Sequence, residues 1–165
     1  MSTDFADYRL RMRAGVPTGA QPPNNVARPS YYLVGLTHGV RRGARVVDLD
    51  QRRRLAGAIR AHHPRALVHD PVEDWYGGPA PEPDGPARLA EFHRLTGLAA
   101  GSEVCVAWLP DRESVTDSVA EVQVARRAGS TVVAITGEAD DFLVRAFASV
   151  VLPDLDAFTE WVQAA

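Results

Sequence analysis

Short apolar runs alternate with amphipathic segments along most of this chain. Five runs are apolar at consecutive positions, which is typical of strands buried on both faces: residues 31–36, 66–69, 104–109, 131–136 and 149–152. Five segments between and after these runs have the composition and spacing of helices: residues 50–61, 86–100, 118–128, 140–148 and a last helix that begins after Asp154. This strict alternation predicts a parallel sheet covered by helices.

The predicted elements define the fold class and the domain boundaries. Five short strands with intervening helices suit an α/β fold with a five-stranded parallel sheet, a flavodoxin-like doubly wound three-layer α/β/α architecture. Residues 1–30 have no sustained period and are rich in Gly, Pro and Asn, so we predict a flexible N-terminal arm there. Residues 31–165 are predicted to form one α/β domain.

Composition excludes several function classes. The sequence has 165 residues, 45% hydrophobic and 24% charged, which is ordinary for a soluble globular domain. Its net charge of -3 gives no electrostatic reason to expect a nucleic-acid partner. No apolar run approaches the roughly 20 residues that span a bilayer, so we expect no membrane partner.

The reactive residue types narrow the chemistry further. The sequence contains no lysine, which argues against a Schiff-base enzyme and a Walker-type phosphate loop. The single cysteine, Cys105, cannot form a disulfide within one chain, and this favours a cytoplasmic location. The five histidines show no metal-ligand spacing, so we predict neither a metal nor a cofactor.

The loop after the first predicted strand is a candidate binding loop. In parallel sheets of this kind, ligands bind outside the carboxyl ends of the strands. Glycines there let a ligand approach the backbone, and Thr, His and Arg side chains can donate to phosphate or sugar hydroxyls. The alternative is a solvated loop, and the spacing is not that of a dinucleotide-binding motif. The candidate binding residues are Gly35, Thr37, His38, Gly39 and Arg41.

The second candidate loop begins at Asp70. Pro71 favours extended backbone at Asp70, which would project the carboxylate from the strand end. The carboxylate could bind ribose hydroxyls or assist proton transfer, or it could simply bond its own backbone in a turn. Trp75, which follows, could stack on a base or lie on the surface of the protein.

The third candidate region lies before and within the predicted helix 118–128. Residues 111–118 are polar and are predicted to form a loop whose hydroxyls face a ligand, with Ser114, Thr116 and Ser118 as binding residues. Glu121 is expected in the first turn of the helix. Ser118 and Glu121 then form either a capping box or, with the free N–H groups of a helix N-terminus, part of an anion-binding pocket.

Several segments, taken in order, resemble the nucleoside 2-deoxyribosyltransferases. These segments are Tyr32-Leu-Val-Gly35, Ser102 to Leu109, Ser118-Val-Ala-Glu121 with Ala125 and Gly129, and the tail from Phe142 to Phe158. Together they extend over residues 31–163. Asp117 stands where the family usually has glycine.

The resemblance implies a chemistry and a set of roles. In that family a helix glutamate attacks C1′ of a (deoxy)ribosyl group, and a base or water then resolves the glycosyl ester. By resemblance Glu121 is the nucleophile, while Asp70 and then Asp117 are candidates for the acid that protonates the leaving group. Members of the family usually self-associate, so a homo-oligomer is expected.

Three functions follow as hypotheses. The first is cleavage or exchange of the N-glycosidic bond of a nucleoside or nucleotide. The second is a non-catalytic nucleotide- or sugar-phosphate-binding module, since the stretch from Ser118 to Thr136 also resembles phosphosugar-binding sugar isomerase domains. The third is an oligomeric interaction protein with an inert pocket. Loss of Glu121 should abolish only the first of these activities.

Overall fold

The computed structural model describes residues 28–34, 49–71, 73 and 85–164. Five strands form one sheet in the order β2-β1-β3-β4-β5, and all of their pairings are parallel. The strands are β1 (Ser30–Val34), β2 (Leu67–His69), β3 (Val104–Trp108), β4 (Thr131–Ile135) and β5 (Val150–Leu152). This order is the flavodoxin-like one, so the predicted fold class is confirmed. The predicted N-terminal arm lies almost entirely outside the described residues.

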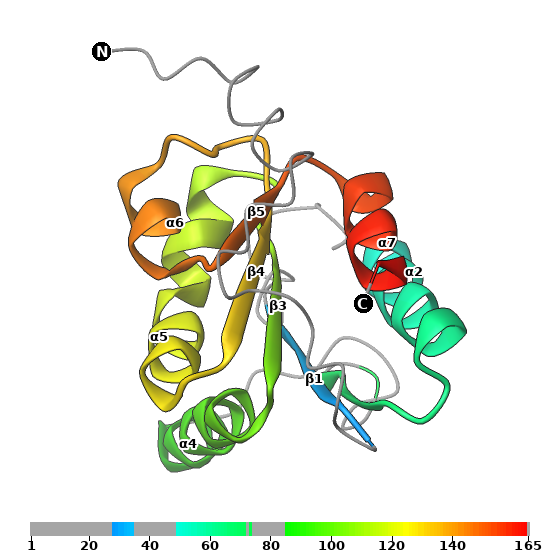
Figure 1. Ribbon diagram of the computed structural model, residues 1–165. Coiled ribbons are helices and arrows are strands. Elements are labelled where there is room, and N and C mark those ends of the chain that lie inside the picture. The colour runs from blue at the N-terminus through cyan, green and yellow to red at the C-terminus, as the bar shows by residue number, and fades with distance from the viewer. Residues whose placement is uncertain (1–27, 35–48, 72, 74–84, 165) are drawn as a thin grey trace.

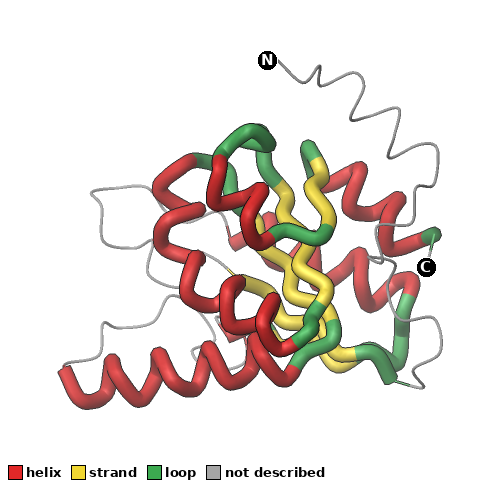
Figure 2. Tube along the Cα trace, turned by 60° about the vertical axis from the view of Figure 1, so that its left-hand side comes forward, coloured by secondary structure: helices red, strands yellow, loops and turns green. Residues whose placement is uncertain are grey.

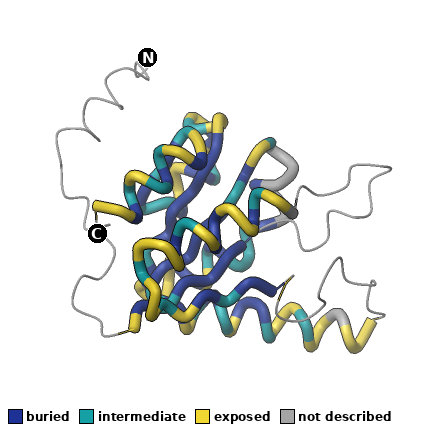
Figure 3. The backbone as a smooth tube through the Cα atoms, turned by 90° about the vertical axis from the view of Figure 1, so that its right-hand side faces the viewer, coloured by how far each residue is buried: buried dark blue, intermediate teal, exposed yellow. Residues whose placement is uncertain are grey.

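Helices cover both faces of the sheet (Figures 1 and 2). One face packs against α2 (Leu49–His62) and α7 (Leu155–Gln163). The other packs against α4 (Gly85–Gly101), α5 (Arg112–Ala128) and α6 (Phe142–Phe147). Buried positions run along the strands and the inner sides of the helices (Figure 3).

Side-chain alternation along β1 assigns its two tyrosines to opposite layers. Tyr31 packs in the core cluster under α2 and α7, and Tyr32 packs in the cluster under α4, α5 and α6. Both side chains are fully buried. In the sheet register Tyr32 lies between His69 of β2 and Cys105 of β3. The buried position of Cys105 agrees with the expectation from sequence.

Capping residues mark the ends of three helices. Asp154 caps α7, its side chain accepting a 2.8 Å hydrogen bond from the backbone N–H of Ala157. Asp141 caps α6 in the same way, accepting from the N–H of Leu143 at 2.8 Å. Gly129 ends α5 with a φ of 94°, the left-handed conformation that glycine adopts without steric cost.

The start of α5 differs from the prediction. The helix begins at Arg112, so residues 112–117 are helical and not loop. The buried positions Val115, Ser118, Val122 and Ala125 follow helical spacing, and this stripe holds the segment against the sheet. The predicted capping box of Ser118 and Glu121 is therefore wrong, as is the idea that free N–H groups of a helix N-terminus surround Glu121. Glu121 lies in the third turn.

Candidate functional site

The site centres on a hydrogen bond between Glu121 and Tyr32. The Tyr32 hydroxyl donates to Oε2 of Glu121 at 2.5 Å, joining α5 to the central strand β1. A distance this short is typical of a hydroxyl that donates to a charged oxygen. The phenol ring is fully buried and the glutamate is half-buried, so the sheet fixes one oxygen of the carboxylate.

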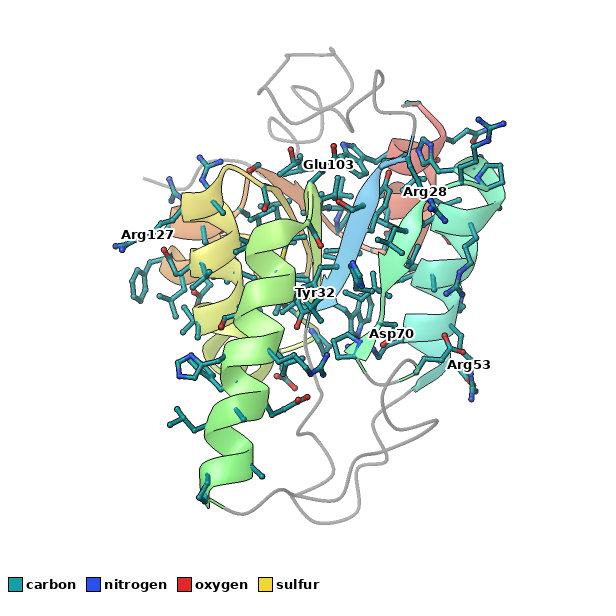
Figure 4. All side chains as sticks on the ribbon, turned by 90° about the horizontal axis from the view of Figure 1, so that it is seen from below. Arg28, Tyr32, Arg53, Asp70, Glu103 and Arg127 are labelled. Atoms are coloured by element: carbon teal, nitrogen blue, oxygen red, sulfur yellow. The ribbon has the colours of Figure 1, made fainter. Side chains whose placement is uncertain are left out.

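A buried arginine pair lies next to this hydrogen bond. Arg52, in the first turn of α2, donates from Nε to Oδ1 of Asp70 at 2.9 Å, and its Nη2 forms a salt bridge with the same oxygen at 2.9 Å. Its Nη2 also donates to the carbonyl of Leu33, the residue after Tyr32, at 2.8 Å. Arg52 is 5% exposed and Asp70 2%. Tyr32 and Asp70 lie toward the same end of the sheet, opposite to Glu103 (Figure 4).

Opposing influences determine the ionisation of Glu121. Burial, the largest influence, raises the pKa of its carboxyl group above the ordinary value. The hydrogen bond from Tyr32 and the positive charge of Arg52 both lower that pKa, whereas the negative charge of Glu91 raises it. Glu91 itself binds Arg94 on α4 through two hydrogen bonds of 2.8 and 2.7 Å. The site thus holds a desolvated carboxylate with specific partners for its charged form.

The Tyr32 hydroxyl and the Cys105 thiol, which lie near the Glu121 carboxylate, stay protonated at neutral pH. Burial raises the pKa of the Tyr32 hydroxyl far above its ordinary value, and Glu121 raises it further. Burial also raises the pKa of the Cys105 thiol, with Glu121 adding to the effect. A buried thiol of this kind is a poor nucleophile, which leaves Glu121 as the reactive group that these residues surround.

Ser118 lies one turn before Glu121 on α5. Its hydroxyl oxygen is buried and has no hydrogen-bond partner among the described residues. Buried hydroxyls are normally hydrogen-bonded, so a bound water or ligand atom is the expected partner. The role of Ser118 in binding stays a prediction.

The structure describes only some of the remaining predicted site residues. Asp70 is buried in its pair with Arg52, so its carboxylate binds a guanidinium and does not project freely from the strand end. Asp117 falls within α5, but its side chain is outside the description, as are those of Ser114 and Thr116. The first binding loop and the candidate stacking residue lie outside the described residues: Gly35, Thr37, His38, Gly39, Arg41 and Trp75.

Sequence reasoning missed Tyr32 and Arg52 as site residues, although signals for both exist. Tyr32 lies in an apolar strand, and a buried tyrosine hydroxyl normally requires a partner. Arg52 precedes Leu55, Ala56 and Ile59 by three, four and seven positions. An arginine on this core-facing stripe is buried and must be paired.

The part of the chain that the structure describes offers neither a metal centre nor a membrane-spanning helix. There, no group of three or more His, Cys, Asp or Glu side chains is arranged to hold a metal ion. None of the helices in that part is both long and apolar enough to cross a membrane.

Comparisons with known proteins establish similarity of fold. No family model and no curated protein matches the sequence. Among solved structures, a conserved protein from Enterococcus faecalis V583 matches with a TM-score of 0.59 at 18% identity, over 84% of this chain and 99% of that one. The Clostridium botulinum CMP N-glycosidase BcmB matches with a TM-score of 0.46 at 10% identity, over 82% of this chain and 99% of that one. The Enterococcus faecalis match, at 18% identity, shows a shared fold.

Proposed function

We propose that this protein cleaves or exchanges the N-glycosidic bond of a nucleoside or nucleotide, with Glu121 as the nucleophile. The observation that carries the proposal is the fixed carboxylate of Glu121, held through Oε2 by the Tyr32 hydroxyl. It is supported by the order of sequence motifs that resemble the nucleoside 2-deoxyribosyltransferases.

The arrangement suits attack on an anomeric carbon. One carboxylate oxygen bonds to C1′ as the C1′–N bond breaks, and the departing base takes the bonding electrons and a proton from water. Water or a second base then attacks C1′, and the ester bond to Glu121 breaks to restore the carboxylate. Desolvation makes the carboxylate reactive, while the hydrogen bond from Tyr32 and the charge of Arg52 oppose the rise in its pKa that burial causes.

Purified enzyme would be incubated with ribo- and deoxyribonucleosides and their 5′-monophosphates, with and without an acceptor base, and free base measured by chromatography. We expect release by the wild type and none by Glu121→Gln. Release that requires the acceptor would identify a transferase, and release without it a hydrolase. The matched control is Glu103→Gln, because Glu103 lies at the opposite end of the sheet and binds Ser30.

A second candidate function is binding without catalysis, and the buried, unpartnered hydroxyl of Ser118 favours it. If no substrate in the panel releases base, the glycosidic proposal is wrong. Thermal shifts with the same compounds would then test the binding module. In that case Ser118→Ala should abolish the shift and Glu121→Gln should preserve it.

A further inference from the structure

The guanidinium of Arg52 is fixed from two sides. Oδ1 of Asp70 accepts a hydrogen bond from Nε and forms a salt bridge with Nη2, and the Leu33 carbonyl accepts a hydrogen bond from Nη2. These contacts join α2, the end of β2 and the backbone of β1. Leu33 directly follows Tyr32, so the fixed charge lies beside the strand segment that holds Glu121.

Stability alone does not explain the burial of this ion pair. An arginine only 5% exposed has given up its hydration, and a buried ion pair often stabilises a protein no more than apolar residues of similar volume would. The Arg52 charge, however, acts beyond its partner. It lowers the pKa of both Glu121 and Tyr32.

We propose that Arg52 is a positioning residue whose fixed charge stabilises the ionised form of the Glu121 carboxylate, and that Asp70 anchors Arg52 and is not the acid that protonates the leaving group. The inference rests on the proposed function for its catalytic consequence. The effect of the Arg52 charge on the ionisation of Glu121 can be tested whether or not the protein is an enzyme. The hydrogen bond from Nε to Asp70 Oδ1 and the salt bridge of Nη2 with the same oxygen, both 2.9 Å long and buried, assign Asp70 the anchoring role.

Other charged and titratable groups face Glu121 from the elements around it. Tyr32 donates from β1, and Cys105 lies in the neighbouring strand β3. Glu91 acts from α4, where Arg94 binds it and offsets its charge. Arg52 thus acts on Glu121 as a cation from α2. Its removal should raise the pKa of Glu121, because burial and the charge of Glu91 would then be less opposed.

The electrostatic part can be measured without turnover. Proteins labelled with ¹³C at the glutamate carboxyls would be titrated by NMR, with the Glu121 resonance identified by its loss in Glu121→Gln. We expect the Glu121 midpoint to lie at higher pH in Arg52→Met than in wild type. Arg53→Met is the matched control, since the exposed Arg53 pairs with Asp50 on the outer side of α2 and should leave the midpoint unchanged.

A second variant allows the test to be made if Arg52→Met does not fold. Arg52→Met leaves Asp70 buried without its guanidinium, which can prevent folding. The double variant Arg52→Met/Asp70→Asn removes both charges and should also raise the Glu121 midpoint. A midpoint in folded Arg52→Met or the double variant equal to that of wild type would overturn the role of Arg52.

Kinetics test the role of Asp70. Asparagine keeps an acceptor oxygen for Arg52 but cannot act as an acid, so Asp70→Asn should lower kcat by less than about tenfold, and Asp70→Ala should lower it further. General acid catalysis contributes roughly 10²- to 10⁴-fold. A loss of that size, equal in both variants, would overturn the anchoring role. If wild type releases base from no substrate, the proposed function fails while the titration still decides the role of Arg52.

Discussion

Replacement of Tyr32 by phenylalanine tests the hydrogen bond at the centre of the site. The change removes the hydroxyl 2.5 Å from Oε2 of Glu121 and keeps the ring that packs in the buried cluster under α5. A hydrogen bond to a charged group contributes about 1.5–3 kcal/mol, which corresponds to a factor of roughly 10 to 150. Because the bond lowers the pKa of Glu121, its loss raises that pKa.

The assay is kcat/KM as a function of pH for the substrate that releases base fastest. Nucleophilic attack requires ionised Glu121, so the acid limb of the Tyr32→Phe profile should move to higher pH. Activity on that limb should fall by the factor above, and the difference should shrink once the pH exceeds the raised pKa. An unshifted limb, or a loss equal at every pH, would refute the reasoning.

The neighbouring tyrosine provides the control. Tyr31 is equally buried but faces α2 and α7, where its ring stacks on His63 with centroids 6.0 Å apart. Its hydroxyl has no hydrogen-bond partner among the described residues. Tyr31→Phe should therefore leave the pH profile of kcat/KM unchanged.

Three further predictions concern stability. Burial raises the pKa of Glu121 in the folded protein, so its contribution to stability is fully present below the unfolded pKa of 4.5 and is lost as pH rises through the folded pKa. The variant Glu121→Gln should therefore raise Tm, measured by calorimetry, at pH 8 and much less at pH 4. Asp154→Ala should lower the unfolding free energy by about 1 kcal/mol in urea titrations, through loss of the cap of α7, whereas Asp156→Ala should not remove that cap. Gly129→Ala should cost about 1 kcal/mol in the same assay, because its φ of 94° disfavours a side chain.

The fold could be predicted because the burial of its strands leaves a clear pattern in the sequence. Parallel strands covered on both faces must be apolar at consecutive positions, and runs such as 104–109 show this directly. The start of α5 was not predictable in the same way. Residues 111–114 are polar and read as a loop, and the apolar contact that holds the first turns appears only at Val115 once the helix packs on the sheet.

The candidate nucleophile was predictable, but its environment was not. Glu121 was found through its place in a motif, while its partner Tyr32 lies 89 positions away. Arg52 and Asp70 are 18 positions apart and meet only because β2 pairs beside β1. Such contacts depend on topology and register, so local spacing indicates which residues need partners and cannot name them.

The measurement that tests the central claim most directly is detection of the glycosyl ester on Glu121. Reactions with the substrate that releases base would be quenched in acid within one turnover and digested with trypsin. Because the sequence lacks lysine, cleavage after Arg112 and Arg126 yields a peptide, residues 113–126, that contains Glu121. The account predicts that mass spectrometry finds this peptide heavier by one (deoxy)ribosyl group in wild type and unmodified in Glu121→Gln. Rapid base release with no adduct on this peptide, or with the adduct on Glu113 or Asp117, would contradict the claim.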